Sequence, residues 1–233
     1  MTDRWPERVR GARGNPDTSE RAASNLVLIG GALDEDPEIL RCIATLATEA
    51  RNERKAHEQS GTTAPNGSAT TLDRAFAPRI AILTTASRPA PSQDAAGSAS
   101  AENDEADGRY YAELFARHGM VGVPIPVGVA AEPPFEGASY HRGTAESEQV
   151  AEIVRSCDGV FLGGGDQTHY VLSLFRSEEP AQPPFGGRHD TPVMRAIREV
   201  LGHGGVVAGT SAGLAAQQAA PMVSGGSSSE AWL

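Results

Sequence analysis

The sequence predicts the α/β class, with a mostly parallel sheet between two layers of helices. Short, continuous apolar runs that end in glycine or threonine alternate along the chain with stretches whose apolar residues recur at helical spacing. Such runs are typical of strands buried on both faces, and their alternation with helices requires right-handed crossovers between parallel strands. A length of 233 residues suits one such domain. We therefore expect a polar arm over 1–24 and a single domain over 25–233.

Five apolar runs are expected to form the strands of the sheet. They lie at residues 25–29, 79–83, 121–125, 159–162 and 205–208. Runs of this length bounded by turn residues favour strands over helices. Parallel strands joined by crossover helices make a doubly wound, flavodoxin-like three-layer sandwich, which places its functional groups at the carboxyl edge of the sheet.

Amphipathic stretches between these runs predict the helices. Pro37 and Pro192 each open one, at a first-turn position that proline favours. Further helices are expected around Tyr110, over 146–155 and after Gln167. The acidic stretch Asp34-Glu35-Asp36 either caps the helix near Pro37 or binds a cationic substrate, and capping is favoured.

Three polar insertions interrupt this pattern, near 52–74, 88–107 and 128–147. They lack hydrophobic periodicity and are rich in alanine, serine, proline and glycine, which is typical of solvated loops.

The composition excludes several functional classes. The formal net charge of −10 opposes general binding to nucleic acid or to an anionic membrane, which requires a basic surface. No apolar run approaches the ~18 residues of a membrane span, and no secretory signal is visible, so we expect a cytoplasmic protein. Cys42 and Cys157 fit neither a disulfide framework nor a metal site, and we expect no metal.

The strongest chemical motif is Gly209-Thr210-Ser211-Ala212-Gly213, which is G-x-S-x-G between a predicted strand and a helix. The abrupt turn would expose the Ser211 hydroxyl, and bulk two residues to either side would clash. Ser211 is therefore the candidate nucleophile, and the Ala212 N–H a candidate oxyanion donor. The alternative is a glycine-rich turn with an incidental serine.

A second motif, Gly163-Gly164-Gly165-Asp166-Gln167, follows the preceding strand. Three glycines allow close approach of a ligand and expose backbone N–H groups, so Gly164 and Gly165 are candidates for a further oxyanion donor. Asp166 and Gln167 could bind polar ends of a substrate. The alternative is a phosphate-binding or purely structural turn.

Together these two motifs resemble those of the cyanophycinase and dipeptidase E-like serine peptidases, whose fold is akin to class I glutamine amidotransferases. The similarity extends, with interruptions at the insertions, from about Asn25 to Gly226. Segments that also resemble the family are Ile29–Ala32, Thr84–Ser87, Cys157–Gln167, Val206–Gly213 and Met222–Gly226.

The resemblance implies a function. Ser211 matches the nucleophile, the Gly164–Gly165 backbone and Ala212 match the oxyanion region, and Gln167 matches a position in the active-site loop. It implies a serine-type exopeptidase that hydrolyses the arginine–polyaspartate polymer to β-Asp-Arg dipeptides through an acyl-enzyme, without metal or cofactor. The resemblance also implies a peptide or polymer substrate as the partner of the protein, and it is compatible with a homodimer. The alternatives are a dipeptidase that cleaves Asp-Xaa and a non-catalytic remnant of the fold.

The sequence departs from the family at the general base. A serine nucleophile needs a base within hydrogen-bond reach, and the family's histidine lies beyond the elbow. No histidine follows Ser211 here, and of the earlier ones only His169 is near the expected site. The remaining histidines are His57, His118, His141, His189 and His203. We therefore expect a C-terminally truncated chain that lacks its last strands and its base.

Overall fold

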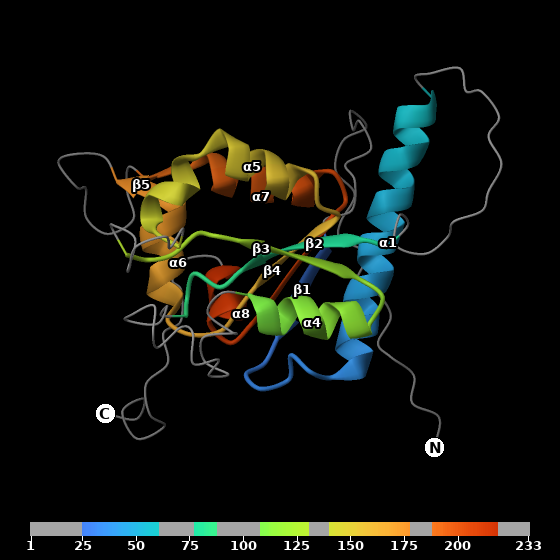
Figure 1. Ribbon diagram of the computed structural model, residues 1–233, viewed down its shortest axis with the longest axis horizontal. Coiled ribbons are helices and arrows are strands. Elements are labelled where there is room, and N and C mark those ends of the chain that lie inside the picture. The colour runs from blue at the N-terminus through green and yellow to red at the C-terminus, as the bar shows by residue number, and fades with distance from the viewer. Residues whose placement is uncertain (1–24, 61–76, 88–107, 131–139, 178–187, 219–233) are drawn as a thin grey trace, which may run out of the picture.

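The α/β class is confirmed by a five-stranded sheet in which all strands are parallel (Figure 1). The computed structural model describes residues 25–60, 77–87, 108–130, 140–177 and 188–218. The strands are β1 (Asn25–Ile29), β2 (Arg79–Leu83), β3 (Val121–Ile125), β4 (Gly159–Leu162) and β7 (Val206–Thr210). Four of these match the expected bounds, and β7 is shifted to include Gly209 and Thr210.

Helices cover both faces of this sheet. On one face lie α1 (Pro37–Ser60) and α4 (Arg109–Arg117), and on the other lie α5 (Glu148–Arg155) and α7 (Pro192–Gly202) (Figure 1). Two further helices, α6 (Gln167–Leu174) and α8 (Ala212–Ala216), contribute buried residues to the α5–α7 side. Each layer has its own apolar core, as a doubly covered sheet requires.

The strand order is β1-β7-β4-β2-β3. The strands β2, β3, β4 and β7 follow the order 2-1-3-4 of flavodoxin-like sheets, and β1 lies at the outer edge beside β7. The two strands that carry the chemical motifs, β4 and β7, are hydrogen-bonded neighbours, with Leu162 paired to Gly209. Their motifs therefore leave the sheet at the same edge.

Several local features differ from the sequence-based expectations. The helix α1 continues to Ser60, so the first part of the polar stretch 52–74 is helical. The sequence predicts no strand between α6 and α7, but a two-stranded antiparallel ribbon lies there, made of β5 (Phe175–Ser177) and β6 (Arg188–Asp190).

The insertion near 128–147 ends in a short 3₁₀ helix, η1 (Arg142–Glu146), before α5. The predicted arm over 1–24, the insertion over 88–107 and the segment 222–226 lie outside the described residues.

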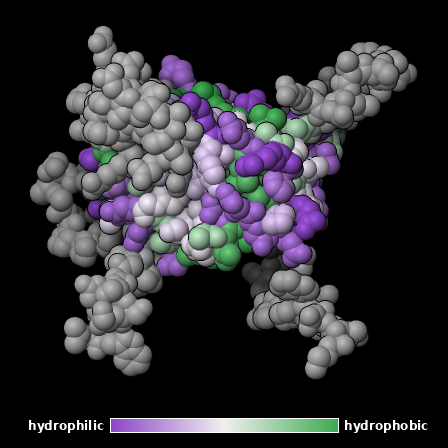
Figure 2. Space-filling model, turned by 60° about the horizontal axis from the view of Figure 1, so that its bottom comes forward, coloured by the Kyte–Doolittle hydropathy of each residue, from purple (hydrophilic) through white to green (hydrophobic). Residues whose placement is uncertain are grey.

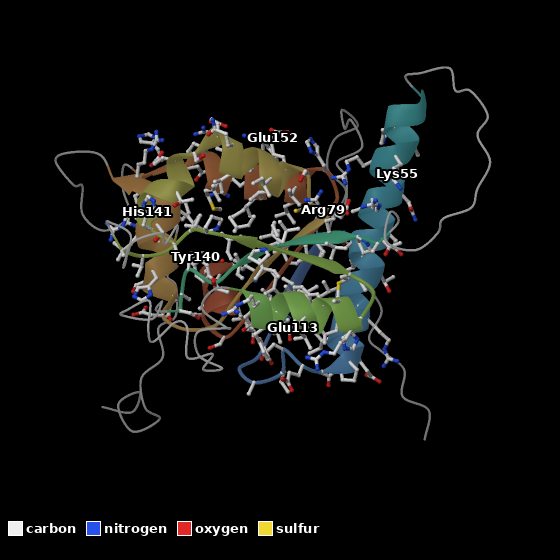
Figure 3. The ribbon with its side chains drawn as sticks, in the orientation of Figure 1. Lys55, Arg79, Glu113, Tyr140, His141 and Glu152 are labelled. Atoms are coloured by element: carbon white, nitrogen blue, oxygen red, sulfur yellow. The ribbon has the colours of Figure 1, made fainter. Side chains whose placement is uncertain are left out.

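A buried carboxylate ties α1 to the amino end of the sheet. Asp158, just before β4, accepts hydrogen bonds from Arg51 Nη1 (3.2 Å), Arg54 Nη2 (2.5 Å) and the Arg79 backbone N–H (2.8 Å). Its side chain is fully buried. Figure 3 shows Arg79 at the end of the sheet nearest α1. These contacts explain why α1 extends through a polar sequence that lacks an apolar stripe.

Asp158→Asn is expected to lower the free energy of unfolding by about 3 kcal/mol, because it removes a buried charge and leaves two arginines without their counterion. Urea unfolding followed by circular dichroism measures the change. Glu38→Gln is the control, since the Arg41–Glu38 pair is exposed and such pairs contribute little. Equal stability of the Asp158 variant and the control would contradict the role assigned to Asp158.

The two cysteines occupy different environments. Cys42 is exposed, whereas Cys157 is buried and burial raises the pKa of its thiol to about 11. Cys157 is thus a neutral core residue. None of the helices in the described ranges combines the length and the apolar character needed to span a bilayer. On the face shown in Figure 2, hydrophilic residues predominate and hydrophobic ones form small, scattered patches.

Candidate functional site

Ser211 lies at an abrupt strand-to-helix junction, as the motif predicts. The strand β7 ends at Thr210 and α8 begins at Ala212. Between them Ser211 has φ 50° and ψ −110°, a sparsely populated conformation for a residue with a side chain. Such strain costs about 1–3 kcal/mol and persists only where the surroundings fix it. Here the Ser211 N–H donates to the Ile29 carbonyl (3.2 Å) and its carbonyl accepts from the Ala215 N–H (3.0 Å).

Two glycines make this turn sterically feasible. A Cβ at Gly213 would lie 2.0 Å from the Leu162 carbonyl oxygen. A Cβ at Gly209 would lie 2.6 Å from the Gly213 carbonyl carbon and from Gln217 Nε2. The clash expected two residues to either side of Ser211 is therefore present in the structure. The side chain of Ser211 itself is exposed.

The glycine loop after β4 lies directly beside this elbow. A Cβ at Gly164 would be 3.6 Å from the Cβ of Ser211. Gly165 has φ 129°, and a Cβ there would meet the Ala86 carbonyl oxygen at 2.3 Å, so only glycine fits. The expected proximity of the two motifs is thus observed.

Three backbone N–H groups at this junction have no acceptor among the described residues. Two backbone hydrogen bonds anchor the loop. The Gly163 N–H donates to the Leu83 carbonyl, and the Asp166 N–H donates to the Ala86 carbonyl. The N–H groups of Gly164 and Gly165 between them make no such bond, nor does that of Ala212 in the first turn of α8. Unpaired N–H groups of this kind can bind an anionic oxygen.

An open cavity of about 730 Å³ contains this junction. It brings together the candidates Ser211, Ala212, Gly165, Asp166 and Gln167, and Gly164 adjoins Ser211. The other lining residues are Gly31, Thr168, Leu214, Ala215 and Gln218.

Gly31 was not among the candidate site residues. Gly31 follows β1, and a Cβ placed on it would lie 4.0 Å from the Cβ of Ser211. The glycine pair at the end of the first strand is the sequence feature that indicates Gly31. It assigns Gly31 to the site only when β1 is known to lie beside β7. Within the described ranges, no three His, Cys, Asp or Glu side chains gather as metal ligands would.

Asp166 combines a local structural contact with a place in the cavity. Its Oδ1 accepts hydrogen bonds from the Thr168 N–H (2.9 Å) and hydroxyl (2.6 Å), so it caps the N-terminus of α6. The side chain nevertheless remains about half exposed (53%). Asp166 therefore presents negative charge to the cavity while it fixes the start of α6.

His169, the histidine nearest to the expected site, is not among the described residues that line the cavity. It is buried, and its Nδ1 lies 3.0 Å from the Ala86 carbonyl oxygen. Its Nε2 lies 3.8 Å from Asp166 Oδ2. No histidine is among the described residues that line the cavity.

The acidic stretch after β1 serves local structure. Asp36 Oδ1 accepts from the backbone N–H groups of Glu38 (2.8 Å) and Ile39 (3.2 Å), which caps α1. Glu35 accepts a hydrogen bond from the Tyr110 hydroxyl. Of the two interpretations of this stretch, helix capping is the one that these contacts support.

Tyr170 anchors the start of the glycine loop to the core. Its buried hydroxyl lies 2.9 Å from both the Leu83 and the Gly163 carbonyl oxygens, at the ends of β2 and β4. Burial raises the pKa of this hydroxyl well above its usual value, so Tyr170 stays a neutral donor. The loop that carries Gly164 is therefore positioned from the core.

The chain is a distant homologue of cyanophycinase over part of its length. It is 41% identical over 90 residues to the cyanophycinases of Trichormus variabilis and of a Nostoc species, a match that covers 38% of this chain and 25% of each relative. The matched part thus spans about a quarter of the length of these curated relatives. No family model matches the chain.

Among solved structures, the chain resembles a peptidase from an acI-B1 actinobacterium. The identity is 19% and the TM-score 0.43, with 82% of this chain and 55% of that one covered.

Proposed function

We propose that the chain carries the nucleophile and oxyanion region of a serine-type exopeptidase that hydrolyses the arginine–polyaspartate polymer to β-Asp-Arg dipeptides. The observation that carries this proposal is the strained Ser211, exposed in an open cavity and adjacent to Gly164. The distant homology to cyanophycinase supports the substrate class.

In this mechanism the Ser211 hydroxyl attacks the scissile carbonyl carbon and gives its proton to a base. The carbonyl oxygen becomes an oxyanion, which the N–H groups of Gly164, Gly165 and Ala212 would stabilise. The protonated base then gives this proton to the leaving nitrogen, and collapse of the intermediate expels the amine and leaves an ester on Ser211. Water then hydrolyses the ester and regenerates the hydroxyl.

The charge of the cavity fits a cationic substrate. Asp166 is the one titratable side chain among its described lining residues, and Gln167 beside it supplies an amide. A carboxylate of this kind can bind a guanidinium group through charge-assisted hydrogen bonds. Gln167 would hold backbone or carboxylate groups of the substrate.

The expected rate of hydrolysis depends on the general base that takes the proton of Ser211. The Asp166 Oδ1 is occupied by Thr168, and His169 does not line the cavity. Loss of the histidine from a serine triad lowers kcat by up to about 10⁶-fold, although oxyanion donors and binding still give some catalysis over water. We therefore expect slow turnover by this chain.

The test is incubation of the protein with the purified polymer and, separately, with Asp-Xaa dipeptides. Products are separated by chromatography and identified by mass spectrometry over long incubations. Release of β-Asp-Arg from the polymer supports the proposal, whereas cleavage of the dipeptides alone favours the Asp-Xaa dipeptidase. Binding of the polymer without any cleavage or covalent intermediate would favour a non-catalytic protein and overturn it.

A further inference from the structure

The segment Thr84–Ser87, which follows β2, packs against the glycine loop. The Ser87 N–H donates to the Thr84 carbonyl (2.9 Å), which closes a tight turn. A Cβ placed on Gly165 would lie 2.3 Å from the Ala86 carbonyl oxygen and 3.0 Å from the Ser87 nitrogen. The Gly165 backbone thus lies directly against the peptide group that joins Ala86 to Ser87. The mechanism proposed above gives this segment no role.

Ser87 also makes a hydrogen bond to the loop through its side chain. Its hydroxyl donates to the Gly164 carbonyl oxygen at 3.2 Å. Ser87 is half-buried, and it is not among the described residues that line the cavity around Ser211. The hydroxyl therefore reaches the Gly164–Gly165 peptide group from outside the cavity.

The orientation of the Gly164 carbonyl determines the orientation of the next N–H group. A trans peptide group is planar, so the Gly164 C=O and the Gly165 N–H point in opposite directions. Because the carbonyl is directed at Ser87, the Gly165 N–H is directed away from Ser87. Gly165 lines the cavity, and its N–H has no acceptor among the described residues. The Ser87 hydroxyl thus favours the orientation in which this N–H faces the cavity.

Glycine itself places little constraint on this peptide group. Gly164 and Gly165 lack the Cβ atoms that restrict backbone rotation in other residues. Rotation by half a turn would exchange the two ends of the group and direct the Gly164 carbonyl oxygen into the cavity. A carbonyl oxygen there would repel an oxyanion, whereas an N–H group stabilises it. A contact that selects one of the two orientations therefore affects the chemistry of the site.

The other contacts of the loop hold its ends. The Gly163 N–H donates to the Leu83 carbonyl, and the Asp166 N–H donates to the Ala86 carbonyl. Neither bond involves the peptide group between Gly164 and Gly165. Among the described residues, the Ser87 hydroxyl is the one group that forms a hydrogen bond with it.

We propose that Ser87 is a positioning residue of the oxyanion region, which holds the Gly164–Gly165 peptide group with its N–H toward the cavity. In this role Ser87 does not touch the substrate and acts only through Gly165. The inference rests on the proposed function, because the Gly165 N–H is one of the groups assigned there to the oxyanion. It gives the turn after β2 a part in the reaction.

The kinetic test compares the labelling of Ser87 variants by a serine-directed fluorophosphonate, whose phosphoryl oxygen takes the place of the oxyanion. Loss of a whole oxyanion donor lowers the rate by about 10²–10³-fold. Ser87→Ala leaves the donor present but frees its peptide group, so the maximal rate of labelling, kinact, should fall by about 10-fold. The concentration that gives half of this rate, KI, should not change. Ser87→Thr keeps the hydroxyl and should restore kinact.

Ser173→Ala is the matched control. The Ser173 hydroxyl also donates to a backbone carbonyl, that of Gly128 (3.0 Å), and Ser173 is buried and does not line the cavity. Loss of this bond should lower stability, as loss of any buried hydrogen bond does, but should leave kinact unchanged. An equal fall in kinact in both variants, or no fall in Ser87→Ala, would overturn the proposal.

Nuclear magnetic resonance tests the orientation without any chemistry at Ser211. In protein labelled with carbon and nitrogen isotopes only in glycine, a triple-resonance spectrum shows the carbonyl signals of glycines that precede another glycine, and Gly164 is one of these. Ser87→Ala should shift the Gly164 carbonyl and Gly165 N–H signals, and Ser173→Ala should not. Unchanged signals in Ser87→Ala would overturn the proposal. A wild-type chain that takes no label, with the signals shifted in Ser87→Ala, would contradict the proposed function and still support the positioning by Ser87.

Discussion

Gly213→Ala is expected to destabilise the domain by more than about 3 kcal/mol, a large part of the stability of a domain. The new Cβ would lie 2.0 Å from the Leu162 carbonyl oxygen and 2.6 Å from its carbonyl carbon. Both atoms belong to the backbone of the central strand β4, so no side-chain rotation relieves the contact. Either α8 moves away from β4 or the ladder between β4 and β7 is distorted.

Gly202→Ala provides the matched control. Gly202 ends α7, and a Cβ there meets nothing within 4 Å. Because alanine is the better helix former, this variant should be unchanged or stabilised by up to about 1 kcal/mol. Urea unfolding of both variants measures the difference. A Gly213 variant as stable as its control would show that the close packing of α8 on β4 is not required.

The strands and the elbow could be predicted because local sequence determines them. Runs such as Arg79–Leu83 and Gly159–Leu162 are largely apolar, and they form strands with the expected bounds. The elbow was predictable because Gly209 and Gly213 meet a steric requirement that depends only on the turn. Local constraints of this kind leave a signature in the sequence.

Features that depend on distant partners had no such signature. The second half of α1 is polar, and its helical state rests on contacts such as that of Arg54 with Asp158, 104 residues away. The ribbon of β5 and β6 consists of short polar segments without alternation. Gly31 joins the site only because β1 neighbours β7, the last strand of the sheet in chain order among those described. Strand order does not follow from the order of apolar runs.

Ser211→Ala is expected to abolish covalent chemistry at the site. The wild-type chain should acquire one adduct on incubation with a serine-directed fluorophosphonate, because the reagent's phosphoryl oxygen can occupy the position of an oxyanion. Removal of the hydroxyl removes the nucleophilic atom of the proposed mechanism, and release of β-Asp-Arg should fall to the rate of the blank. Intact-mass spectrometry and product analysis measure the two effects.

The control and a rescue experiment make this prediction specific. Ser156→Ala removes an exposed hydroxyl at the end of α5, which donates to the Ile153 carbonyl and does not line the cavity, so labelling should be unchanged. Because the described lining residues of the cavity include no histidine, added imidazole should accelerate labelling of the wild-type chain by supplying the base. The Ser211 variant should show no such rescue, since it lacks the atom that the base would activate. Labelling or turnover that survives Ser211→Ala would exclude Ser211 as the nucleophile, and with it the serine-peptidase mechanism.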